Sequence, residues 1–239
     1  MRGSIKSGLN AVLLTACALL AGNLHAQTRP TQIIAHYKIH KSGILIGTVE
    51  ERFTRNGDSY KIVSETHTAG VLKWLLNDQV TLSSEGRIGS NGLEPTRYEL
   101  RRHNDPTRNI SALFEYGRNQ IVSSHHNKTE SFVLPPGTQD RISAMYQFVF
   151  VAPLTPVVSI WMSQGKEAEQ YHYRKQGEPV IKIGDIAYST VHYARETKPG
   201  GSQAQLWLAK DRHYLPVRIV FEDSRGISLE QTLVDLRMQ

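Results

Sequence analysis

The stretch "GTQDRISAMYQFVF" (137–150) interrupts a chain whose other apolar residues mostly alternate along the sequence. Its apolar side chains recur at the i, i+3, i+4 and i+7 spacing of one helical face: Ile142, Met145, Tyr146 and Val149. "PPG" (135–137) stops the preceding segment, and Pro153 and Pro156 follow the stretch. Because proline disfavours helix on either side of it, the pattern predicts one helix over about residues 139–150.

The Asp-x-x-Ser pattern in this stretch has two interpretations. Thr138 or Asp140 can cap the first turn, where a carboxylate accepts backbone N–H bonds and meets the positive end of the helix dipole. A catalytic Ser143 would need a neighbouring base and an oxyanion hole, and the sequence indicates neither. We therefore interpret Thr138 and Asp140 as helix N-terminal caps.

The rest of the chain has the pattern of β-strands. "LPVRIVFED" (215–223) is the clearest case, because alternate residues are apolar. Turn signals such as "RNGD" (55–58), "SNG" (90–92) and "SRG" (224–226) separate such runs, and short turns join antiparallel neighbours. The sequence predicts a mainly β protein: a single antiparallel curved sheet or partly closed β-barrel of about 10–12 strands, with the helix in or against its concave face.

The first 26 residues have the features of a secretory signal peptide. A basic start with Arg2 and Lys6 precedes the apolar run "AVLLTACALLAG" (11–22), and cleavage is predicted between Ala26 and Gln27. Residues 27–239 are then predicted to form a single β-rich domain, since no repeat or interdomain linker interrupts them.

Two alternatives to cleavage at Ala26 remain open. The segment could be kept as an anchor, although it is shorter than the roughly 20 apolar residues that span a bilayer. "LTAC" (14–17) also fits the site at which bacterial lipoproteins are cleaved and acylated, here on Cys17. In that case the processed chain would begin with a prolonged apolar run, where lipoproteins usually turn polar.

The composition of the processed chain excludes several classes. The chain has 28 basic and 22 acidic residues; loss of Arg2 and Lys6 leaves 26 basic residues and a net charge of +4. This small, dispersed excess does not indicate nucleic-acid binding. Cys17 is the only cysteine, so the processed chain would contain no disulfide and no thiol nucleophile.

Metal and cofactor motifs are not apparent. His36 and His40 lie four residues apart on a predicted strand, which separates them by about 13 Å, too far for one zinc ion. H-E-x-x-H, C-x-x-C and G-x-S-x-G do not occur. We therefore predict no metal, no cofactor and no catalytic residue.

An apolar segment, "GVLKWLLND" (70–78), lies where a polar loop is expected. It can be a short helix that covers one end of the sheet, or a flap for an apolar ligand or a contact for a membrane or partner. The ligand-binding residues predicted on the second interpretation are Trp74, Leu75, Tyr146 and Phe150.

Three motifs in series resemble a known family: "SSEGRIGSNGLEPTRYE" (83–99), the 137–150 stretch, and "LWLAKDRHYLPVRIVFED" (206–223). Over about residues 37–236 the chain resembles the bacterial envelope proteins of domain-of-unknown-function family 3108. The resemblance implies a Gram-negative periplasmic location and brings no activity, catalytic residue or cofactor. It gives no role to His213 and Tyr214.

The expected architecture is also similar to that of periplasmic lipoprotein carriers, which hold acyl chains in a half-open barrel. That similarity concerns architecture only. The leading hypothesis is a non-catalytic periplasmic protein that binds an apolar or amphipathic, lipid-like ligand or assists envelope assembly. The alternative is a scaffolding protein that docks an envelope protein partner, and a third is a hydrolase. An integral membrane protein is not expected.

Overall fold

The computed structural model describes residues 29–70, 79–126, 128–197 and 200–239. The first half of the described chain contains eight strands: β1 (Gln32–Lys41), β2 (Ile44–Asn56), β3 (Ser59–Thr68), β4 (Gln79–Gly89), β5 (Gly92–Arg102), β6 (Ile110–Glu115), β7 (Gln120–His125) and β8 (Lys128–Val133).

The second half contains the helix and the other strands: β9 (Gln139–Asp140), α2 (Ser143–Phe150), β10 (Val157–Ser163), β11 (Glu169–Gly177), β12 (Val180–Ile183), β13 (Ile186–Arg195), β14 (Gln203–Ala209), β15 (Leu215–Glu222) and β16 (Ser228–Met238).

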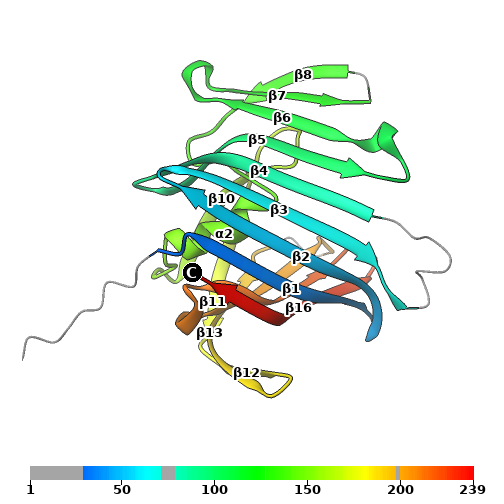
Figure 1. Ribbon diagram of the computed structural model, residues 1–239, viewed down its shortest axis with the longest axis vertical. Helices are drawn as coiled ribbons and strands as arrows, with labels where there is room; N and C mark the ends of the chain where they lie inside the picture. Colours follow the sequence, from blue (N-terminus) through cyan, green and yellow to red (C-terminus); the bar gives the residue numbers. More distant parts are fainter. Residues whose placement is uncertain (1–28, 71–78, 127, 198–199) are drawn as a thin grey trace, which may run out of the picture.

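These strands form one 16-stranded sheet. Its order runs from β8 through β7 to β1, continues from β16 to β13, and ends with β11, β10 and β9, while β12 pairs with β13. β1 pairs antiparallel with β16, so the first and last strands meet within the sheet. Figure 1 shows the sheet bent back on itself with α2 inside the bend.

The predicted fold class, a curved and mainly antiparallel sheet with one helix, is confirmed for the described residues. The predicted strand number was too low, because β8 is almost wholly exposed and β9 and β12 are short, so none shows a long apolar alternation. The helix also begins later than predicted. Gln139 and Asp140 instead pair in parallel with Met162 and Ser163 of β10.

Alternation along the strands places apolar residues in the hollow of the sheet. β1 buries Ile33, Ala35 and Tyr37 there, and β2 buries Phe53. The apolar side of α2 fills the same space: the ring centroids of Phe53 and Tyr146 lie 5.7 Å apart. Each large side chain buried in this way contributes about 1.5–3 kcal/mol. The helix therefore completes the core that the sheet alone would leave open.

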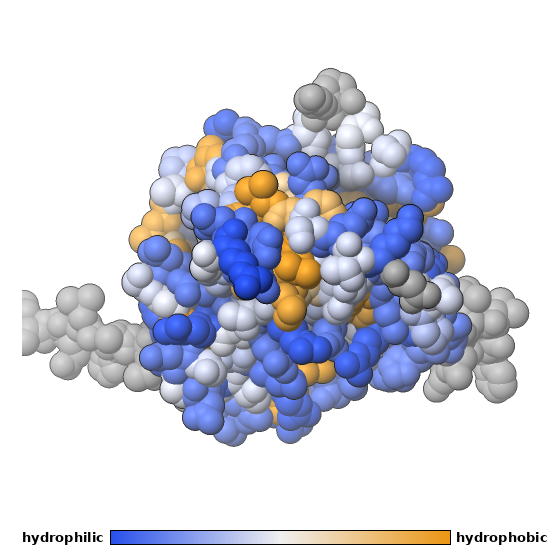
Figure 2. All heavy atoms as spheres, turned by 90° about the horizontal axis from the view of Figure 1, so that it is seen from above, coloured by the Kyte–Doolittle hydropathy of each residue, from blue (hydrophilic) through white to orange (hydrophobic). Residues whose placement is uncertain are grey.

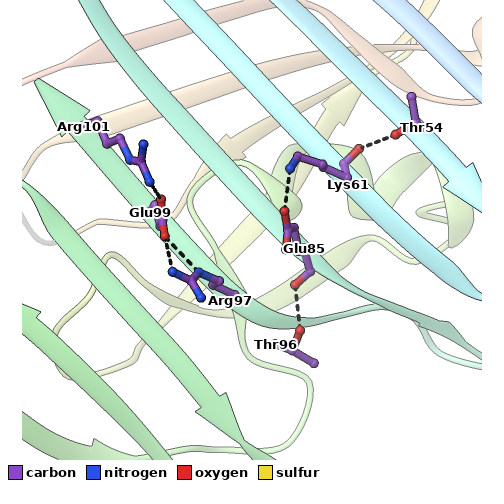
Figure 3. Close-up of polar contacts among 7 residues, drawn as sticks. All are labelled: Thr54, Lys61, Glu85, Thr96, Arg97, Glu99 and Arg101. Carbon is purple, nitrogen blue, oxygen red and sulfur yellow. Dashed lines mark hydrogen bonds and ion pairs between the residues drawn. The ribbon is translucent and has the colours of Figure 1, made fainter. Parts of the chain in front are cut away.

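Charged side chains lie on the outer face of strands β3, β4 and β5 (Figure 3). Glu99 accepts from Arg97 and Arg101 at 2.5 and 2.6 Å along β5, and Lys61 of β3 pairs with Glu85 of β4 at 2.7 Å. Exposed ion pairs of this kind add little stability. They do disfavour a shift of the strand register by one residue, because such a shift would move these charges into the core.

Two glutamines join the helix segment to the β4–β5 hairpin across the hollow. Gln139 Nε2 donates to the Leu93 carbonyl at 2.8 Å. Gln147 Oε1 accepts the Leu93 N–H at 2.7 Å, and its Nε2 donates to the Asn91 carbonyl at 2.8 Å. These side chains bring β9 and α2 against β5, which lies far from β9 in the order of the sheet.

Asp140 fixes the start of the helix. Its Oδ1 accepts the N–H groups of Ile142 and Ser143 at 2.9 and 2.8 Å, while Ser143 Oγ accepts the Asp140 N–H at 2.9 Å. This reciprocal pair works as a capping box does. Asp140 Oδ2 accepts the Ser84 hydroxyl of β4 at 2.5 Å. The Thr138 hydroxyl instead donates to the Pro135 carbonyl, in the turn before the helix.

We predict that Asp140→Ala lowers the free energy of unfolding by about 2–4 kcal/mol, because two buried N–H groups and the Ser84 hydroxyl lose their acceptor. Guanidinium denaturation followed by circular dichroism measures the change. Asp185→Ala, which removes an exposed carboxylate, is the control. Equal unfolding midpoints for the two variants would contradict the capping role.

Candidate ligand-binding site

Of the four ligand-binding residues predicted from the sequence, the structure describes Tyr146 and Phe150. Trp74 and Leu75 lie outside the described residues. Tyr146 and Phe150 are 0 % and 6 % exposed and pack in the core, where the Phe150 ring lies 5.3 Å from that of Phe53. These two rings fill the space between α2 and β2.

Asp140 and Ser143 are engaged in structural contacts. Burial raises the pKa of the Asp140 carboxyl to about 6, and the hydrogen bonds from Ser143, Ser84 and Ile142 lower it in part. The Ser143 hydroxyl accepts the Asp140 N–H and is itself completely buried. A nucleophile has to meet its substrate, and Ser143 in this arrangement serves to begin the helix.

A second carboxylate, Glu51, is buried among apolar side chains. The alternation of β2 turns it inward between Val49 and Phe53. Burial raises the pKa of the Glu51 carboxyl to about 7, and its polar neighbours Tyr146, Ser64 and Gln231 lower it in part. Since it lines neither cavity described below, Glu51 is a titratable group of the core.

A cavity of about 290 Å³ lies between the end of α2, the chain that follows it, and β10. Its wall is largely apolar, with Phe148, Val151, Leu154, Val158 and Ile160 among the lining residues. Val151 and Leu154 are 40 % and 83 % exposed, so large apolar groups are in contact with water at this cavity. Such a wall is typical of sites for apolar small molecules.

The chain after α2 is held in place by prolines and by one tyrosine. The helix ends at Phe150, and Pro153 and Pro156 keep the following chain from continuing it. The Tyr193 hydroxyl of β13 lies 3.1 Å from the Pro153 carbonyl and 2.7 Å from that of Thr155, each an acceptor for its hydrogen. This wall of the cavity is therefore tied to the sheet.

Gln139 adds one polar group to the lining. Gln139 is 2 % exposed, and its Nε2 donates to the carbonyls of Leu93 and Gly137. Its Oε1 is buried and has no hydrogen-bond partner among the described residues. Leaving such an acceptor unpaired costs about 1–3 kcal/mol. Because the wall of the cavity is largely apolar, the cavity suits an apolar molecule.

The sequence did not point to this cavity. Gln139 was part of the predicted helix, and the apolar residues beside the prolines of "VAPLTP" (151–156) were the available signal.

Within the described ranges, no three His, Cys, Asp or Glu side chains converge as metal ligands would. No helix among those residues combines the length and the apolar character needed to cross a membrane.

The architecture defines a class of protein: a curved, incompletely closed β-sheet, resembling a barrel, that holds a helix in its hollow. The chain belongs to the family described as "Protein of unknown function (DUF3108)", whose sequence profile matches residues 35–234.

Among solved structures, the chain is similar to a β-barrel-like protein of domain of unknown function DUF1849 from Brucella abortus. The two share 11 % identity with a TM-score of 0.57, over 88 % of this chain and 99 % of the other. At this identity the similarity shows the fold alone. No curated protein matched the sequence.

The buried Glu51 carboxyl makes stability depend on pH. Because its folded pKa is raised, the folded state holds a proton that the unfolded state releases, so the contribution of Glu51 to stability is fully present below about pH 4.5 and is lost as pH rises through about 7. We predict that Glu51→Gln raises the free energy of unfolding at pH 8 by up to about 3 kcal/mol and changes it little at pH 4.

Urea denaturation between pH 4 and pH 8 measures this effect. Glu50→Gln removes the neighbouring carboxylate, which is exposed on the outer face, and should shift the curve by less than about 0.5 kcal/mol at every pH. Parallel pH profiles for the wild type and Glu51→Gln would refute the assignment of a titrating core carboxyl.

Proposed function

We propose that this protein is a non-catalytic binding protein of the periplasm that holds an apolar or amphipathic molecule in the cavity between α2 and β10. The observation that carries the proposal is the largely apolar wall of this cavity, at which Val151 and Leu154 are in contact with water. The apolar part of the ligand would lie along Phe148 and Ile160.

The size of the cavity limits the affinity. Burial of about eight methylene groups contributes about 6 kcal/mol, from which the loss of ligand freedom is subtracted. The expected dissociation constant is therefore micromolar or weaker. Such affinity fits a protein that takes up and releases its ligand.

The periplasmic location is part of the proposal. It is supported by the basic start, the apolar run and the small residue at Ala26 in the first 26 residues, and by membership of a family that we interpret as bacterial envelope proteins. Assistance in envelope assembly would follow if the ligand is a lipid in transit.

Protein docking is a second candidate, favoured by the exposure of Leu154. A large apolar side chain that is 83 % exposed beside a cavity is also typical of a protein contact. Seen from the side on which β8 lies, the surface is largely hydrophilic, with an apolar patch near the middle of the view (Figure 2).

The two candidates differ in what is bound at Val151 and Leu154. We predict that the double variant Val151→Gln/Leu154→Gln weakens binding of the uncharged fluorescent probe N-phenyl-1-naphthylamine by about tenfold, since two apolar contacts worth roughly 1 kcal/mol together or more are lost. Fluorescence titration gives the dissociation constants, and lipid extraction with mass spectrometry identifies any ligand carried from the periplasm.

The matched control is Val133→Gln/Val180→Gln, which removes two exposed apolar side chains elsewhere (74 % and 69 % exposed). It should leave probe binding unchanged. Equal binding by both double variants would reject this cavity as the ligand site. A ligand-free protein whose stoichiometric partner is lost in the first double variant would favour docking.

A further inference from the structure

A second cavity, of about 190 Å³, lies at the other half of the sheet and shares no lining residue with the first. Its floor is apolar, formed by Leu100 of β5 and Ile110 of β6. Its other lining residues are basic or imidazole side chains, among them Arg102, Arg108 and Lys166.

The backbone around β5 holds the two arginines on this cavity. Leu100 and Arg102 lie two residues apart in β5, so they share one face of the sheet. The Arg102 N–H donates to Asn109 Oδ1 at 2.8 Å. That bond ties the short 3-10 helix η2 (Pro106–Arg108) to β5, and Arg108 is the last residue of η2.

The loop that carries Lys166 is packed onto β6 and β7. The Gly165 carbonyl accepts the Ser123 hydroxyl at 2.5 Å, and Ser163 Oγ donates to the Lys166 carbonyl at 2.6 Å. A Cβ at Gly165, whose φ is +84°, would lie 2.2 Å from Ile110 Cγ2. The backbone thus approaches Ile110 as only glycine permits, which places Lys166 at the cavity.

The positive charge of the cavity is only partly balanced. Arg108 Nε lies 4.0 Å from Asp105 Oδ2, a distant pair. Among the described residues, Arg102 and Lys166 take part in no ion pair. Charges of one sign around a low-dielectric floor raise the local concentration of counter-ions. A bound anion would supply the missing partner.

His125 provides a further unused group. Its Nε2 lies 3.0 Å from Glu130 Oε2, and its Nδ1 is buried without a hydrogen-bond partner in the described part of the chain. His125 and His126 both line the cavity, with ring centroids 5.8 Å apart in an edge-on arrangement.

We propose that this cavity binds a phosphate group, with the apolar part of the same ligand against Leu100 and Ile110. The guanidinium groups of Arg102 and Arg108 suit two phosphate oxygens each, and Lys166 adds a point charge. Several converging donors match the multiple oxygens of a phosphate better than the two of a carboxylate. The phosphate can belong to a small soluble molecule or to a lipid headgroup.

The test is titration of the protein with inorganic phosphate and, separately, with short-chain dihexanoyl-phosphatidylglycerol below its micelle concentration. Backbone amide NMR shifts give both the site and the dissociation constants. We expect both probes to shift amides of β5, β6 and the Gly165 loop, and Arg102→Gln/Lys166→Gln to weaken binding at least about tenfold. Lys166→Gln alone should also weaken binding, and because Lys166 is exposed this variant should fold normally.

The control is Lys61→Gln/Arg101→Gln, which removes the same charge from the outer face (Figure 3). It should leave both dissociation constants within about twofold. Tighter binding of the lipid than of phosphate assigns the site to a headgroup, and equal binding assigns it to a soluble phosphate. No shift by either probe at about 10 mM, or equal weakening in the control, would overturn the proposal.

Discussion

The structure depends on one constraint: a wide, bent sheet has a concave apolar face that must be covered. In most β-barrels the strands close on each other and side chains fill the interior. Here the described strands run from β8 to β9 as an open path, and α2 fills the hollow. The contact of Tyr146 and Phe150 with Phe53 is the centre of that filling.

Filling the hollow with a helix brings polar groups inside, and each needs a partner. Asp140 obtains its partners from the helix N-terminus and from Ser84 of β4. Burial raises the pKa of both the Asp140 and the Glu51 carboxyl, and hydrogen bonds from polar neighbours offset part of each rise. Gln139 keeps one acceptor unpaired among the described residues. The helix therefore fills the hollow at the cost of burying ionisable and polar groups.

The two cavities differ in chemistry. The one beside α2 is largely apolar, whereas the one between β5, β6 and the Gly165 loop has cations over an apolar floor. Both arise where a chain segment departs from the sheet and is tied back by side-chain hydrogen bonds: Tyr193 holds the first, and Ser123 holds the second. Loops fixed on a rigid sheet commonly carry function.

The sequence by itself determined the β class and the position of the helix after residue 137 to within a few residues, because alternation and helical spacing are local properties. Asp140 was recognisable as a cap for the same reason. The cavities were decided only in three dimensions. Gln139, Leu154, Arg102 and Lys166 are ordinary residues in sequence, and they acquire meaning because bending of the sheet and the return of β9 to β5 bring distant segments together, which no local pattern records.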